Sequence, residues 1–224
     1  MTRARIHELY AHPLAGEAIE RESFRCIDAE APEHALAPEQ WKVARRLIHT
    51  TADFGLLAEL EFSADAVESG CRALRAGAPI YADSNMVRAG LSLARLQRCC
   101  ARYAPSDIHV HVADSDVADA ARAAKLPRAI YALRKAQTML NGAIVCFGNS
   151  PVGLLELNRM ILEEDVTPAL VIAMPVGFVH VTESKEETAK LDVPQIVIRG
   201  RRGGSPLAVA TVHALTSLVE ENEI

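Results

Sequence analysis

A basic, glycine-rich loop near the end of the chain is the segment best suited to binding an anion. It reads Arg199-Gly200-Arg201-Arg202-Gly203-Gly204-Ser205. A β-branched run at 194–198 precedes it, and an Ala/Val/Leu stretch with helical spacing at 206–219 follows it. A strand, a glycine turn and a serine-capped helix together present backbone N–H groups and the positive end of a helix, and arginines add bidentate donors. We therefore predict a site for a small polyanion, either a phosphate or a polycarboxylate.

This loop differs from the known nucleotide-binding loops. No Gly-Lys-Ser/Thr ends it, as in a Walker loop, and it lacks the G-x-G-x-x-G spacing of dinucleotide sites. The alternative interpretation is a solvated basic turn. We favour the anion site because three arginines gather in one turn of a chain whose net charge is −5.

His49 is the side chain that we expect to act as a general acid. It lies in a predicted helix, four residues after Arg45 and four before Asp53, so the three would share one face. The guanidinium group favours a neutral imidazole, whereas Asp53 and an anionic ligand favour the protonated ring. Such a balance lets a histidine donate a proton near neutral pH. The alternative is a surface histidine on a charged helix.

The remaining reactive residue types are weaker candidates. His109 and His111 would face the same side of a strand and could bind a metal ion. The nearest further ligands are Asp114 and Asp116, so packing or edge-strand histidines are favoured and we predict no metal site. The sequence contains neither a C-x-x-C pair nor a G-x-S-x-G elbow. His213, inside the last predicted helix, is interpreted as structural.

The composition is that of a soluble globular protein. The chain has 224 residues, of which 50% are hydrophobic and 4% aromatic. A pI of about 5.9 argues against nucleic acid as a partner. No apolar run reaches the ~18 residues of a membrane span, no signal region opens the chain, and five cysteines do not suggest a disulfide framework. We expect one domain over residues 1–224, working in the cytoplasm.

The periodicity of apolar residues changes along the chain. Helical spacing predicts helices at 16–30, at 38 to about 54, and from a cap at 63–65 to near 77. Short apolar runs follow, most of them leading into a turn and a helix, at 79–82, 108–112, 143–147, 169–174 and 195–198. This repetition predicts a three-layer α/β/α fold with a mainly parallel, five-stranded sheet of flavodoxin-like order and extra N-terminal helices.

Polar residues follow the predicted strands where such a sheet binds its ligand, at the carboxyl ends near the switch in strand order. We therefore expect a single pocket there. The segments concerned are Asp83-Ser84-Asn85, Asp114-Ser115, Gly148-Asn149-Ser150, Gly177-Phe178 and the basic loop.

Several of these segments, taken in order, resemble the precorrin-8X methylmutase family, the isomerases of cobalamin biosynthesis that are also known as cobalt-precorrin-8 enzymes. The likeness runs through nearly the whole chain from Ser23 onward. Each motif is modest alone, but the series is specific. The motifs are HTTADF at 49–54, ADSNMVRAG at 82–90, GNSP at 148–151, MPVGFV at 174–179, ESKE at 183–186 and the basic loop.

The resemblance implies a flavodoxin-like fold, a homodimer and no cofactor. It also implies a 1,5-sigmatropic methyl shift from C-11 to C-12 of the corrin ring, giving hydrogenobyrinic or cobyrinic acid. The family's histidine falls on His49, as the acid that protonates the ring system. The implied substrate is a tetrapyrrole edged with acetate and propionate groups, which is the kind of polycarboxylate that the loop suits. The resemblance adds Ser23 and Arg128 to the expected substrate contacts, which are then Ser23, Asp83, Ser84, Arg128, Asn149, Gly177, Arg199, Arg201, Gly203, Gly204 and Ser205.

Four positions depart from the family pattern. They are Ser84 for Thr or Glu, Ala129 for Ser, Val152 within a usual Ala-Pro-Thr-Ala, and His213 for Asn. We expect these changes to affect substrate orientation more than reaction class. Two alternatives stay open: a non-catalytic corrinoid-binding paralogue, and an enzyme of the same fold acting on another polycarboxylate. Metal-free and cobalt-bearing substrates are equally compatible with the sequence, which does not define the dimer interface.

Overall fold

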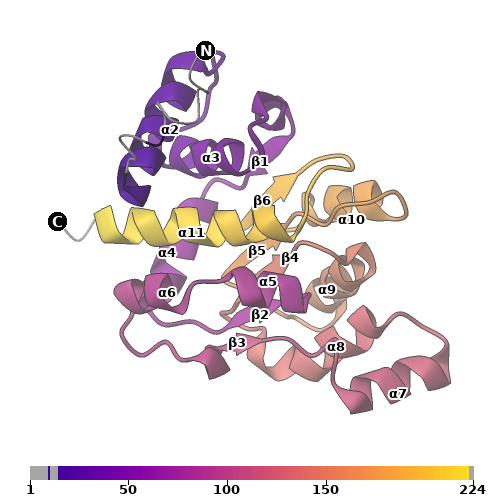
Figure 1. The fold of residues 1–224 in the computed structure, drawn as a ribbon. Coiled ribbons are helices and arrows are strands. Elements are labelled where there is room, and N and C mark those ends of the chain that lie inside the picture. Colours follow the sequence, from indigo (N-terminus) through magenta and orange to yellow (C-terminus); the bar gives the residue numbers. More distant parts are fainter. Residues whose placement is uncertain (1–9, 11–14, 222–224) are drawn as a thin grey trace, which may run out of the picture.

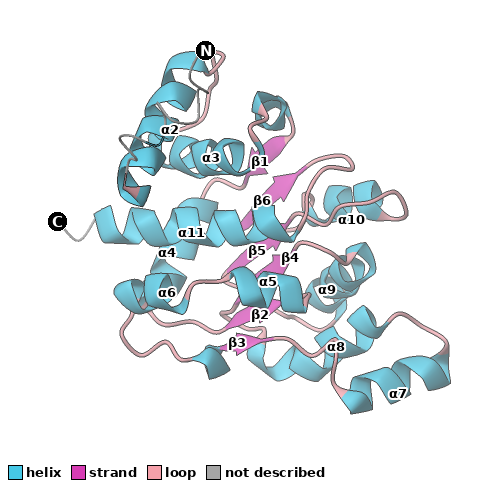
Figure 2. Cartoon of the chain, viewed as in Figure 1, coloured by secondary structure: helices cyan, strands magenta, loops and turns pink. Residues whose placement is uncertain are grey.

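A six-stranded sheet forms the centre of the computed structural model, which describes residue 10 and residues 15–221 (Figures 1 and 2). The strand order is β1-β6-β5-β4-β2-β3, and all neighbours are parallel except β1 and β6. Without β1, the five parallel strands have the flavodoxin-like order that the sequence predicts. The strands are β1 (Leu60–Phe62), β2 (Ile80–Ala82), β3 (Ile108–His109), β4 (Ile144–Phe147), β5 (Leu170–Ala173) and β6 (Gln195–Ile198).

The sixth strand, β1, was not predicted. It is three residues long and contains Glu61, so it shows no apolar run. It forms because its three residues, from Leu60 to Phe62, pair with β6, which would otherwise be an edge strand. β3 is also shorter than predicted and ends at His109. Both differences fall at the two edges of the sheet, where burial constrains the sequence least.

Helices cover both faces of the sheet. One face packs against α3 (Pro38–Thr51), α4 (Ala66–Arg75), α5 (Asn85–Gly90), α6 (Leu93–Cys99) and α11 (Ser205–Glu221). The other packs against α8 (Arg128–Ala136) and α9 (Pro151–Glu163), with α10 (Val181–Thr188) beside α9 and α7 (Ser115–Ala124) beside α8. Short 3-10 turns are η1 (Phe54–Ala58), η2 (Pro105–Asp107) and η3 (Gln137–Met139).

The central strands are buried on both faces, which explains their continuous apolar character. In β4, Ile144 and Cys146 enter the core under α11, whereas Val145 and Phe147 enter the core under α9. α11 begins at the basic loop and crosses the sheet, as Figure 1 shows. The predicted three-layer architecture is therefore confirmed.

The first described long helix, α2 (Gly16–Glu30), lies outside this core. None of its residues is buried, and it packs on α3. Ion pairs join Glu20 to Arg46 and Asp28 to Arg45. In the described part of the chain, no helix is both long and apolar enough to cross a membrane.

Candidate functional site

Asp83, at the end of β2, holds the turn that follows β4. Its Oδ2 accepts hydrogen bonds from the backbone N–H groups of Asn149 (2.7 Å) and Ser150 (2.6 Å). The side chain is only 3% exposed. Burial raises the pKa of this carboxyl, while the bonds from the turn oppose that rise. The carboxylate thus locks the carboxyl ends of two neighbouring strands together.

The start of α11 closes on the same turn. The hydroxyl of Ser84 lies 3.3 Å from that of Ser205, and it also accepts a hydrogen bond from the N–H of Val87 at the start of α5. Gly148 allows this approach, since a Cβ there would lie 2.6 Å from the Cα of Ser205. Four predicted site residues, Asp83, Ser84, Asn149 and Ser205, are therefore brought together.

The glycines of the basic loop fit against the segment after β5. The Gly204 N–H donates to the carbonyl of Met174 (2.8 Å), and the Gly177 N–H donates to the carbonyl of Arg201 (3.3 Å). Gly203 has φ of 154°, and a Cβ there would lie 2.2 Å from the Met174 carbonyl oxygen. Only glycine fits that position. Gly177, Gly203 and Gly204 thus meet, as the sequence predicted for strand ends.

The three arginines of the loop have different surroundings. Arg199 pairs with Glu61 on β1, and Arg202 pairs with Asp53 (3.2 Å). Arg201 instead lies over the ring of Phe178, with its guanidinium carbon 5.2 Å from the centroid. Within the described residues, Arg201 forms no ion pair. It is therefore the arginine of the loop best placed to meet an external anion.

His49 and Ser23 line one groove, of about 510 Å³, between α2 and the end of α3. His49 is exposed there, and its ring meets Phe24 edge-on with centroids 5.4 Å apart. The Phe24 ring also contacts the guanidinium groups of Arg45 (4.5 Å) and Arg46 (5.2 Å). Phe24 therefore links α2 to the helix that carries the predicted acid.

The charges predicted around His49 are arranged differently. α3 ends at Thr51 because Ala52 adopts a left-handed conformation, with φ of 53°. Asp53 consequently lies beyond the helix, where it accepts from the Gly55 N–H (2.8 Å) and pairs with Arg202. Helical spacing alone did not show where α3 ends. The Asp53 carboxylate connects the histidine helix to the basic loop instead.

A second groove, of about 380 Å³, runs along the other side of α3. Thr50, Met86, Ser205 and His213 are among the residues that line it. Nε2 of His213 accepts a hydrogen bond from the Ser92 N–H (3.1 Å). Burial, together with Arg95 and Arg46, lowers the pKa of His213 to about 4. Sequence reasoning missed His213 as a groove residue, since its helical spacing indicated only packing.

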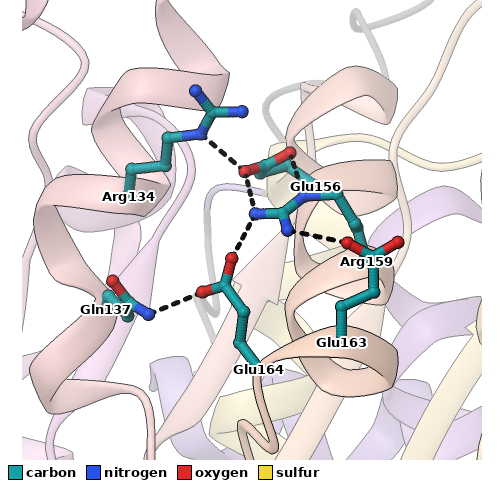
Figure 3. A network of polar contacts seen from close by, with 6 residues as sticks. All are labelled: Arg134, Gln137, Glu156, Arg159, Glu163 and Glu164. Atoms are coloured by element: carbon teal, nitrogen blue, oxygen red, sulfur yellow. Dashed lines mark hydrogen bonds and ion pairs between the residues drawn. The ribbon is translucent and has the colours of Figure 1, made fainter.

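Arg128 is exposed at the first position of α8, near the start of α9. A Cβ at Gly153 of α9 would lie 3.3 Å from the Cβ of Ala129. A network of hydrogen bonds and ion pairs links α8 to α9 (Figure 3). Its members are Arg134, Gln137, Glu156, Arg159, Glu163 and Glu164, with Glu156 paired to Arg134 (2.7 Å) and Arg159 (2.8 Å). This network joins the end of α8 to the middle and end of α9, whereas Arg128 lies at the opposite end of α8.

The histidines at the sheet edge lie apart from these grooves. Nδ1 of His111 lies 2.9 Å from Oδ2 of Asp114, and the His109 and His111 ring centroids are 6.2 Å apart. Burial and the neighbouring His111 lower the pKa of His109. Among the residues that the structure describes, no three His, Cys, Asp or Glu side chains gather as a metal site would require.

Comparison with known proteins gives consistent matches along the chain. The sequence model of the precorrin-8X methylmutase family matches residues 18–218. A cobalt-precorrin-8 methylmutase of Leptospira interrogans is 41% identical over 91% of this chain and 94% of its own. A precorrin-8X methylmutase of Pseudomonas aeruginosa is 37% identical over 90% and 95%. The crystal structure of a Thermus thermophilus precorrin-8X methylmutase has a TM-score of 0.84 and 44% identity, covering 93% of this chain and 98% of that one.

Proposed function

The chain belongs to the precorrin-8X methylmutase family, and from this premise we propose that His49 is the acid of the reaction. Members of this family are isomerases that catalyse a methyl shift in cobalamin biosynthesis, and this chain is one of them. Its substrate class is a tetrapyrrole. The roles of individual residues are our proposal.

The proposed step is an intramolecular 1,5-sigmatropic shift. His49, as imidazolium, donates its proton to the conjugated ring system. The bond from the methyl group to C-11 breaks as the bond to C-12 forms, and the proton then returns to the imidazole. Substrate and product are isomers, so the step needs no co-reactant. General acid catalysis of this kind contributes about 10²–10⁴ in rate, and a cavity shaped for the migrating geometry adds to it.

The observation that carries this proposal is that His49 lines one groove while the next residue along the chain lines a second one. His49 and Ser23 line one groove, and the adjacent Thr50 lines the other together with Ser205. A flat ligand that extends from the basic loop past the end of α3 would therefore bring its ring close to the imidazole. His34, another exposed histidine, lines a separate groove, where it stacks on Trp41 with ring centroids 4.3 Å apart.

The proposed contacts to the substrate's carboxylates are Arg201 and those N–H groups of the basic loop other than the ones of Arg199 and Gly204, which already donate to backbone carbonyls. Arg201 supports this role because it is exposed and forms no ion pair with a described residue. Arg199 has a carboxylate partner already, so we expect it to contribute less. Arg128 and Asn149, both exposed near the carboxyl ends of the strands, are proposed as further contacts.

The experiment that tests this function follows the visible absorbance of purified protein mixed with metal-free or cobalt-bearing precorrin-8. The unmodified enzyme should form the product chromophore, and the preferred substrate identifies the aerobic or the anaerobic route. His49→Ala should bind the substrate but lose turnover by about 10²-fold or more. His34→Ala, at an exposed histidine that lines neither of these two grooves, is the matched control.

Turnover by His49→Ala at a rate near that of the unmodified enzyme would refute the acid role. A bound chromophore that stays unchanged even with unmodified protein would instead indicate a corrinoid carrier.

We further propose a homodimer that works in the cytoplasm. Large apolar side chains are exposed near the basic loop, with Phe178 81% and Val179 68% exposed, and a second copy could cover them. The five cysteines form no disulfide, as suits a reducing compartment. Light scattering of the purified protein would give the mass: twice that of the chain is expected, and the mass of one chain would contradict the dimer.

A further inference from the structure

Lys185 is a buried lysine that no step of the proposed reaction uses. It lies on α10 and is 1% exposed. Its Nζ donates hydrogen bonds to the carbonyl oxygens of Gly200 (3.0 Å) and Arg202, which both belong to the basic loop. Burying a charged group is costly unless the group is well partnered. The structure thus places a buried lysine, whose burial costs free energy, in direct contact with the loop proposed to bind anions.

One acidic group faces this cation. Burial lowers the pKa of the Lys185 ammonium to about 8, and the carboxylate of Glu59, between η1 and β1, opposes that shift. Arg202 of the loop approaches the same carboxylate, with Nε 3.7 Å from Oε2. Lys185 and Arg202 therefore both interact electrostatically with the carboxylate of Glu59.

The helix that carries Lys185 is itself firmly held. Nδ2 of Asn158 on α9 donates to the carbonyl of Ser184 (3.1 Å), and the hydroxyl of Thr188 donates to Oδ1 of Asn158 (3.0 Å). All three residues are buried. The first turn of α9 is capped by Ser150, which bonds to Asp83. α9 therefore connects the turn held by Asp83 to α10, the helix that carries Lys185.

The two carbonyls that Lys185 holds flank Arg201. With the carbonyls of Gly200 and Arg202 turned inward, the peptide between them is fixed, and Arg201 reaches the exposed ring of Phe178. The side chain of Arg202 extends to Asp53 beyond α3. Loss of the ammonium would leave two part-buried carbonyls without their donor, which favours rearrangement of the loop.

We infer that Lys185 is a positioning residue, which fixes the basic loop so that Arg201 faces the substrate. This inference rests on the proposed function of the loop in binding the substrate's carboxylates. It assigns to Lys185 an effect on substrate affinity rather than on the chemical step. A lysine that only stabilised the fold would leave the affinity of the folded enzyme unchanged.

The first test compares Lys185→Met with Lys190→Met. Methionine keeps much of the apolar stem but removes the donor, whereas Lys190 is exposed just beyond α10 and pairs with Glu187. In Lys185→Met, amide hydrogen exchange over residues 199–205 should be at least tenfold faster, with the central strands unchanged. The KM for precorrin-8 should rise about tenfold, while kcat stays within about twofold. Lys190→Met should match the unmodified enzyme.

Two results would overturn the inference. One is loop exchange equal to that of the unmodified protein. The other is a faster-exchanging loop with an unchanged KM. Because hydrogen exchange needs no substrate, failure of the unmodified enzyme to bind or convert precorrin-8 would refute the proposed function separately.

A second measurement covers the case in which Lys185→Met does not fold. In the unmodified protein labelled with ¹⁵N-lysine, the protons on Nζ of Lys185 should exchange slowly with water at neutral pH. The Nζ signal should also show hydrogen-bond couplings to the carbonyl carbons of Gly200 and Arg202. A rapidly exchanging Nζ without these couplings would overturn the inference.

Discussion

At the scale of single residues, the chemistry of this enzyme depends on which charges are already paired. Three arginines look equivalent in the sequence of the basic loop, but the fold gives Arg199 and Arg202 acidic partners from β1 and from the segment after α3. Those partners lie more than a hundred residues away in sequence, so no local pattern shows the pairing. The sequence predicts an anion site here, but it does not show that two of the three arginines are already paired.

Arg201→Gln tests this division of roles. We expect the affinity for the substrate to fall by about tenfold to a hundredfold, because one charge-assisted hydrogen bond contributes roughly 1.5–3 kcal/mol. The loss should shrink as salt is added, since screening weakens the pair that the unmodified enzyme makes. Titration of absorbance at two salt concentrations measures it.

Arg199→Gln is the matched control for that variant. It removes an equal charge from the same loop, but from a side chain already paired with Glu61. Its effect on affinity should be no more than about twofold, as for an exposed ion pair. Equal losses in the two variants would show that the loop acts only through its summed charge.

At the scale of elements, apolar patterns predicted the buried strands well and the edges poorly. β4 and β5 have four consecutive buried residues each, a signal that stands out in the sequence. β1 contains a glutamate and depends on β6 for its pairing, so it has no local signature. In α11 the apolar spacing predicted the helix, yet His213 on it faces a groove and accepts a backbone hydrogen bond.

His213 should make the stability of the protein depend on pH. Its pKa in the folded protein is lowered to about 4 from an ordinary value of 6.5, so between these values the unfolded chain binds more protons. This residue's contribution to the free energy of unfolding is therefore complete above about pH 6.5 and is lost as the pH falls toward 4. Urea titrations over this range should show that loss.

His213→Asn isolates the effect, because an asparagine oxygen can accept the Ser92 N–H without titrating. As the pH falls, the free energy of unfolding of the unmodified protein should decrease more than that of the variant. In His34→Asn, at an exposed histidine, the free energy of unfolding should change with pH as it does in the unmodified protein. If the free energy of unfolding of His213→Asn fell with pH as steeply as that of the unmodified protein, the buried ring would not be the cause of the pH dependence.

At the scale of the whole molecule, stability and the proposed activity depend on different parts. The two hydrophobic cores lie on the faces of the sheet, and α2 contributes no buried residue to either. Yet α2 supplies Ser23 and one wall of the groove at His49. The order of strands and helices could be predicted from the sequence, because each strand and helix carries its own periodicity. The groove could not, because it depends on how α2 lies on α3 through Phe24.

Two phenylalanines separate these contributions. Phe24→Ala removes the ring between α2 and α3 but opens no cavity in either core, so we expect the free energy of unfolding to fall by about 1 kcal/mol or less. Turnover of precorrin-8 should fall by about tenfold, because the wall beside His49 loosens. Phe62→Ala, in β1 against the main core, should cost about 1–3 kcal/mol and leave the KM and kcat of the folded enzyme unchanged. If Phe24→Ala destabilised the protein as strongly as Phe62→Ala, α2 would be part of the folding core, and the groove at His49 would be as rigid as the sheet beneath it.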